Sequence, residues 1–160
     1  MIESKNLKAG GLRLSGMAFE RTFSLAVEYL EKITGVKTST EKIDNALKEA
    51  IHIAIHELAH LYIDEALPCL TKLDDKQHTL VDEVLARFLE RKTSSKLNLL
   101  VESFEEQLEE LRNYPELKEL KWNVESYKEL YNSFEEYVKE GKTLKDFAIF
   151  ELFKRLKIEC

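Results

Sequence analysis

Apolar residues recur every three or four positions along most of the chain, which is the period of an amphipathic helix. The first such run starts near Ala18 and ends before Gly35, a residue type that commonly terminates helices. The second run leads from Thr38 to Pro68, and Thr38 and Glu41 have the spacing of a capping box. We expect these runs to form two helices, the second of them long.

Further runs with the helical period follow a polar loop at residues 68–78. They predict one helix capped by Thr79 and ending near residue 91, and three more at Leu97 to Pro115, Glu116 to Gly141 and Leu144 to Leu156. Only GLRLS, residues 11–15, alternates as a strand would. The pattern therefore predicts a compact helical domain, all-α or mostly α, with at most a short N-terminal strand.

Composition narrows the classes of function. Lys and Arg number 24 against 30 Asp and Glu, a net charge of -6, so the chain has no positive field for nucleic acid. No apolar run approaches the roughly 20 residues of a membrane span, and the first residues lack a signal-peptide core. The two cysteines, Cys69 and Cys160, lie far apart, so we expect no disulfide and a reducing compartment. We expect a soluble, cytoplasmic protein that binds neither nucleic acid nor membrane.

Three of the four histidines lie in the segment IHIAIHELAHLYIDEAL. His56 and His60 are four residues apart, so one helix can present both imidazoles to a single zinc ion. Glu57 can reach a water at the open coordination position and act as general base. His52 and His56 have the same spacing, but Ile53 cannot take a proton, so we expect His52 to be structural.

A catalytic zinc site needs a third protein ligand. Asp64 lies one turn further along the same helix and would strain the geometry, whereas Asp82 and Glu83 belong to the next predicted helix. An antiparallel partner helix would bring Glu83 against the two histidines, where a metal would offset its charge. The residues favour Glu83 and leave Asp82 and Asp64 as alternatives.

HELAH and the downstream DEVLARF together resemble the zincin metallopeptidases of the gluzincin type, including minimal archaeal-type members. The segment from Glu83 to Ala86 is also similar to the E-x-x-A segment of small regulatory peptidases that cleave repressors and antitoxins. The resemblance implies zinc held by His56, His60 and Glu83, with Glu57 as the base and a peptide or protein as the substrate.

The same resemblance implies two further parts of a peptidase. Gluzincins align their substrate on an edge strand, and residues 11–15 are the one strand candidate. They also stabilise the oxyanion with a tyrosine or a histidine, and His78 and Tyr62 lie nearest to the motif in the sequence.

We therefore expect a zinc-dependent hydrolase, a small metallopeptidase, with an N-terminal arm at 1–16, metal-site helices at 17–92 and C-terminal helices at 97–160. A helical interaction protein with a structural or vestigial metal site is the alternative, and an amidase acting on non-peptide substrates is a third hypothesis. The thiol of Cys160, or the terminal carboxylate, could hold the enzyme latent by occupying the fourth zinc position. The aromatic stripe Phe147, Phe150 and Phe153 is expected to be core.

Overall fold

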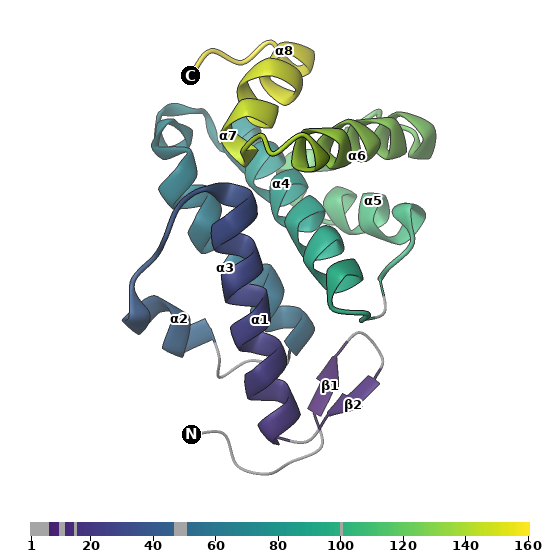
Figure 1. Cartoon of the computed structure of the whole chain (residues 1–160). Coiled ribbons are helices and arrows are strands. Elements are labelled where there is room, and N and C mark those ends of the chain that lie inside the picture. The colour runs from purple at the N-terminus through teal and green to yellow at the C-terminus, as the bar shows by residue number, and fades with distance from the viewer. Residues whose placement is uncertain (1–6, 10–11, 15, 47–50, 100) are drawn as a thin grey trace.

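The structure of the chain is a computed structural model that describes residues 7–9, 12–14, 16–46, 51–99 and 101–160 (Figure 1). Helices dominate it, which confirms the predicted mostly helical class. The elements in chain order are β1 Leu7–Ala9, β2 Leu12–Leu14, α1 Gly16–Thr34, α2 Thr40–Ala46, α3 Ile51–Ala66, η1 Pro68–Lys72, α4 Asp75–Lys96, α5 Phe104–Arg112, η2 Pro115–Leu117, α6 Val124–Lys139, α7 Leu144–Phe147, η3 Ala148–Leu152 and α8 Phe153–Leu156.

Helices α3 and α4 form the pair that positions the site. They pack against each other along their length, and α1 packs against α3. The pair is antiparallel, because His60 meets Asp82 while His56, one turn earlier in α3, meets Glu90, two turns later in α4. The short connection through η1 accounts for this reversal, and the antiparallel pairing predicted from the sequence is confirmed.

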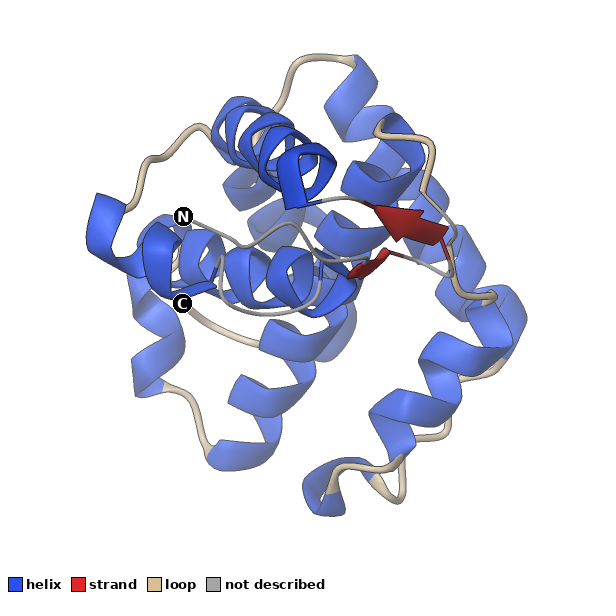
Figure 2. Cartoon of the chain, turned by 90° about the horizontal axis from the view of Figure 1, so that it is seen from below, coloured by secondary structure: helices blue, strands red, loops and turns tan. Residues whose placement is uncertain are grey.

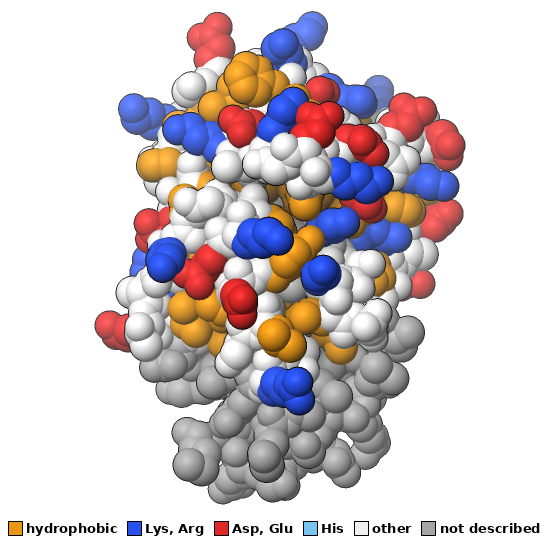
Figure 3. All heavy atoms as spheres, in the orientation of Figure 1, with side chains coloured by type: hydrophobic (Ala, Val, Ile, Leu, Met, Phe, Trp, Pro, Cys, Tyr) orange, Lys and Arg blue, Asp and Glu red, His pale blue; other side chains and the backbone are white. Residues whose placement is uncertain are grey.

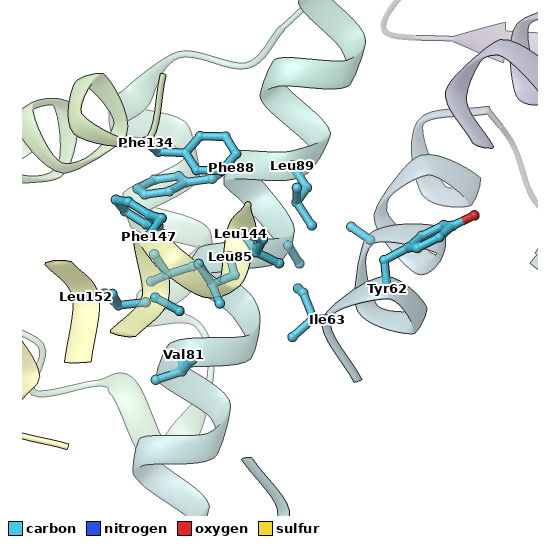
Figure 4. Packing of buried hydrophobic residues seen from close by; sticks show 14 of the residues in the cluster. Tyr62, Ile63, Val81, Leu85, Phe88, Leu89, Phe134, Leu144, Phe147 and Leu152 are labelled. Carbon is cyan, nitrogen blue, oxygen red and sulfur yellow. The ribbon is translucent and has the colours of Figure 1, made fainter. Parts of the chain in front are cut away.

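Aromatic residues of three helices build the core around Phe88, which is fully buried on α4. The ring centroid of Phe88 lies 5.2 Å from that of Tyr131 and 5.8 Å from that of Phe134, both on α6. Phe147 on α7 approaches from another side at 6.1 Å (Figure 4). Such tilted and edge-on pairs add about 0.5–1.5 kcal/mol each beyond the burial of their area. The C-terminal helices thus hold α4 in place behind the site.

The residues predicted to cap two of the helices were wrong. Ser39, not Thr38, caps α2, since its Oγ accepts the backbone N–H of Lys42 at 3.3 Å. Asp74, not Thr79, caps α4, which extends the helix into the predicted loop, with Asp74 accepting the N–H of Gln77 at 2.8 Å. An aspartate is as good a cap as a threonine, and spacing alone does not choose between them.

The helices after α4 also differ from the predicted ranges. α4 continues through residues 92–95, where Thr93 and Ser94 are buried. The next helix, α5, begins only at Phe104 behind the cap Ser103, not at Leu97. The predicted helix from Glu116 starts at Val124 instead, capped by Asn123, with a short η2 before it. The predicted long second helix is described as α2 and α3, and residues 47–50 between them lie outside the described residues.

The last predicted helix covers α7, η3 and α8 in one run, but its middle is a π-helical turn. A π turn holds an extra residue, which rotates the side chains after it relative to an α-helical stripe. Phe147 and Phe153 are buried as expected, whereas Phe150 is 54% exposed. The predicted aromatic core stripe is therefore wrong at Phe150.

A short hairpin forms the N-terminal part of the described chain, and its two strands pair antiparallel with Leu7 opposite Leu14. The predicted strand at residues 11–15 corresponds to β2, whereas its partner β1 was not predicted. β1 contacts α3 and β2 contacts α1. The hairpin lies at the end of the helical body opposite α7 and α8 (Figures 1 and 2).

Cys69 in η1 and Cys160 at the last residue form a disulfide, with Cα atoms 5.6 Å apart. The absence of a disulfide predicted from the sequence is therefore wrong, because folding brings together residues separated by 91 positions. Lys157 adopts the left-handed conformation and ends α8, and Ile158 is buried beyond it. The sulfur of Cys160 is not a free thiol, so the latency hypothesis is wrong for the thiol as the fourth ligand.

No helix in the described part of the chain is long and apolar enough to cross a membrane. On the face shown in Figure 3, basic and acidic side chains alternate, with apolar atoms between them. This face carries no large area of a single charge.

Candidate metal centre

His56 and His60 of α3 meet Glu83 of α4 through their Nε2 atoms. The two Nε2 atoms lie 3.1 Å apart. His60 Nε2 is 3.3 Å from Oε1 of Glu83, and His56 Nε2 is 3.5 Å from Oε2. The structure thus brings together the three residues predicted as ligands, as a group that could hold a metal ion.

Each imidazole is held from behind by a second carboxylate. Nδ1 of His56 lies 3.0 Å from Oε2 of Glu90, and Nδ1 of His60 lies 2.9 Å from Oδ1 of Asp82. A carboxylate there keeps the proton on Nδ1 and leaves Nε2 as a lone-pair donor, the arrangement in which histidines bind metals. Asp82, an alternative ligand in the sequence analysis, therefore orients a ligand instead. Glu90 was not predicted.

The electrostatics of the metal-free site follow from these contacts. Burial lowers the pKa of His56 and His60, but hydrogen bonds to Glu83 and to Glu90 or Asp82 outweigh it and raise them to about 9 and about 10. Burial opposes the charge of Glu83, yet the two histidines and Arg87 hold the pKa of that carboxyl well below its usual range. Three carboxylates thus converge on the imidazoles and favour positive charge between them.

Arg87 follows Glu83 by one helical turn and pairs with its carboxylate. Nη2 of Arg87 lies 3.4 Å from Oε2 of Glu110 on α5, and its guanidinium lies 5.9 Å from the ring centroid of Tyr114. Arg87 therefore ties Glu83 to α5 and to the segment before η2. A charge pair that is this buried is costly to break, so the position of Glu83 is fixed from both sides.

The donor set suits a zinc ion. Zinc bonds of 2.0–2.2 Å in a tetrahedron place neighbouring ligand atoms about 3.3–3.6 Å apart. The two Nε2 atoms lie 3.1 Å apart, and the histidines approach different oxygens of Glu83, at 3.3 Å from Oε1 for His60 and 3.5 Å from Oε2 for His56. One ligand atom from each of the three residues lies within 4.8 Å of the others. Two imidazoles and one carboxylate also match the donor set of catalytic zinc sites with an open fourth position. The residues present therefore fit zinc by donor type and by proximity.

Glu57, the predicted base, is exposed on α3 and has no partner among the described residues. Glu57 is next in sequence to the half-buried His56, and it belongs neither to the metal-binding group nor to the lining of the pocket beside Glu83. Asp64 is exposed one turn after His60 and is not part of the metal-binding group. The side chain of His52 lies outside the described residues.

A pocket of about 340 Å³ opens beside Glu83, between the first turns of α4 and the segment around η2. His78 lines it, in agreement with its nomination. Tyr114 lines it too, and burial and Glu83 raise the pKa of the Tyr114 hydroxyl. Tyr114 was missed because it is far from the histidine motif in the sequence, and only the return of the chain after α5 brings it close.

Tyr62, the other residue nominated for the oxyanion, does not face the site. Its side chain is fully buried, and its hydroxyl oxygen points away from α4 (Figure 4). Two residues after His60, it lies about 200° around the helix axis. The nomination of Tyr62 is therefore wrong.

No family model, curated protein or solved structure matches this chain.

Proposed function

We propose that the protein is a zinc-dependent hydrolase that cleaves peptide bonds. The observation that carries this proposal is the triangle formed by His56, His60 and Glu83, whose ligand atoms, one from each residue, lie within 4.8 Å of one another, with the two Nε2 atoms 3.1 Å apart. Structural zinc sites are closed by four protein ligands, whereas catalytic sites keep one position open. The described group has three members, so it suits the catalytic type.

Other side chains are the candidates for the general base and for the groups that stabilise the oxyanion. Zinc, when bound, supplies Lewis acidity that polarises a carbonyl and lowers the pKa of water toward about 7. Glu57 accepts a proton from the attacking water and passes it to the leaving amine, for which its exposed position beside His56 is suited. His78 and Tyr114 line the adjoining pocket and are the candidates that donate a hydrogen bond to the developing oxyanion.

The hairpin supplies a candidate surface for an extended substrate. β1 pairs with β2 along one edge and contacts α3, the helix that carries both histidines. A peptide that adds to a strand edge gains main-chain hydrogen bonds whatever its sequence. The contact between β1 and α3 supports a role for the hairpin in aligning a peptide with the metal centre.

Zinc content and turnover test the proposal together. Untagged wild-type protein is compared with His60→Ala, Glu83→Ala and Glu57→Gln by elemental analysis and by cleavage of a mixed peptide library. We expect near-stoichiometric zinc in wild type and Glu57→Gln, little in the other two, and zinc-dependent cleavage in wild type alone. Glu65→Ala, an exposed glutamate on α3, is the matched control and should behave as wild type. Cleavage by Glu57→Gln at the wild-type rate would refute the mechanism.

One observation favours the alternative of a helical interaction protein. Without metal, Glu83 already pairs with His56, His60 and Arg87, so the charges of the site compensate one another. A protein that binds no zinc even from excess metal would leave this network with a structural role. The same measurement therefore separates the two functions.

A further inference from the structure

The pocket beside Glu83 carries negative charge that the metal centre does not use. Two of its carboxylates belong to the site, since Asp82 holds His60 and Glu83 faces both histidines. Two more, Asp75 and Glu116, line the same pocket from opposite walls, α4 and η2. Among the described residues, no lysine or arginine lines it.

Asp75 and Glu116 have no partner among the described residues, and both are exposed. They are therefore free to pair with a bound group. The pocket measures about 340 Å³, which is at the lower end of the range for ligand pockets. It has room for a long side chain rather than for a large cofactor.

A second pocket, of about 310 Å³, continues on the other side of Tyr114. Arg87 and Glu110 line it, and this arginine is already paired with Glu83 and Glu110. Arg87 is 5% exposed, and its Nε–H has no hydrogen-bond partner in the described structure. A buried donor without a partner, on a residue that lines a pocket, is a candidate for pairing with an acceptor such as a peptide carbonyl.

We infer that these two pockets form a substrate groove that selects a positively charged side chain, lysine or arginine, next to the bond to be cleaved. The inference rests on the proposed function, because it takes the metal centre as the place where the substrate binds. A cationic side chain in the first pocket meets Asp75 and Glu116, whereas an anionic one meets only like charge.

Peptide binding tests this selection separately from cleavage. Zinc-loaded Glu57→Gln protein is titrated with two fluorescent hexapeptides that differ only in a central lysine or glutamate. We expect the lysine peptide to bind about 10-fold more tightly at low salt, and the difference to shrink at high salt because exposed charges are screened.

The double substitution Asp75→Asn with Glu116→Gln should remove this preference. Glu119→Gln, which neutralises an exposed glutamate outside both pockets, is the control and should keep it. Equal binding of both peptides, tighter binding of the glutamate peptide, or no measurable binding of either would overturn the inference.

Cleavage assays with wild-type protein distinguish failure of the groove inference from failure of the proposed peptidase function. Zinc-dependent cleavage without preference for the lysine peptide would overturn the groove and leave the hydrolase standing. Selective binding of the lysine peptide without cleavage would leave the groove standing and refute the proposed peptidase.

Discussion

The Nδ1 atom of His60 lies 2.9 Å from Oδ1 of Asp82, on the side of the ring opposite the one that faces Glu83. His56 repeats the arrangement with Glu90 at 3.0 Å. Both imidazoles are therefore oriented before any metal binds. This pre-organisation comes entirely from α4, which also supplies Glu83.

We predict that Asp82→Ala and Glu90→Ala each weaken zinc binding by about 10- to 100-fold, because each ligand loses the group that fixes its tautomer and ring plane. Competition with a zinc chelator measures the affinity. Glu129→Ala, at an exposed position on α6, is the control for removal of a negative charge. If both site variants bind zinc as wild type does, the two carboxylates do not orient the ligands.

The pKa values of His56 and His60 predict how zinc affinity depends on pH. Both lie well above 7, at about 9 and about 10, so both rings carry a proton that zinc must displace at neutral pH. Two displaced protons make the apparent affinity rise roughly 100-fold per pH unit between pH 6 and 8. Chelator competition at several pH values measures this slope. A tenfold slope would mean that one of the rings is already neutral.

The stability of the metal-free protein should fall as the pH rises, whereas its zinc affinity should increase. A histidine whose pKa is raised by folding stabilises the folded state fully below about 6.5, and this contribution is lost as the pH rises through the folded pKa values of about 9 and about 10. The urea midpoint of zinc-free protein should therefore fall between pH 7 and pH 10.5. In the double variant His56→Gln with His60→Gln the fall should be smaller, and an equal fall would assign it to other groups.

The sequence was sufficient to predict the group that could hold a metal ion, because two of its members lie four residues apart on one helix. Glu83 was predicted because a polar residue in an apolar stripe needs a partner, and a short connection forces α4 back along α3. These arguments use the helical spacing of apolar residues and the short connection that reverses the chain, and both can be read from a single sequence. The mostly helical class follows from the same period.

The rest of the site depends on contacts between distant parts of the chain. Tyr114 enters because the chain returns toward α4 after α5, and Glu90 enters because the antiparallel packing of α3 and α4 sets it opposite His56. Cys69 and Cys160 are far apart in the sequence and meet where Ile158 packs on the core. The local pattern of apolar and polar residues does not indicate which distant positions come into contact.

Tyr62 lies in the core, whereas Tyr114 lines the pocket beside Glu83. The hydroxyl of Tyr62 is buried without a hydrogen-bond partner in the described structure, and burial raises its pKa to about 12. We predict that Tyr62→Phe leaves turnover unchanged and changes the free energy of unfolding by no more than about 1 kcal/mol, since no described bond is lost. Tyr114→Phe should lower turnover with zinc content unchanged. The reverse pattern would return the catalytic role to Tyr62.

The disulfide between Cys69 and Cys160 should stabilise the fold without touching the metal centre. It links residues 91 positions apart, so loop closure in the unfolded chain predicts a contribution of about 4–5 kcal/mol. We predict that Cys160→Ser lowers the free energy of unfolding in urea by up to this amount, and that a reducing agent does the same to wild type but adds nothing to the variant. Zinc content and turnover of the folded variant should equal those of wild type. Loss of zinc from folded Cys160→Ser would show instead that η1 transmits the position of the chain end to the histidines of α3.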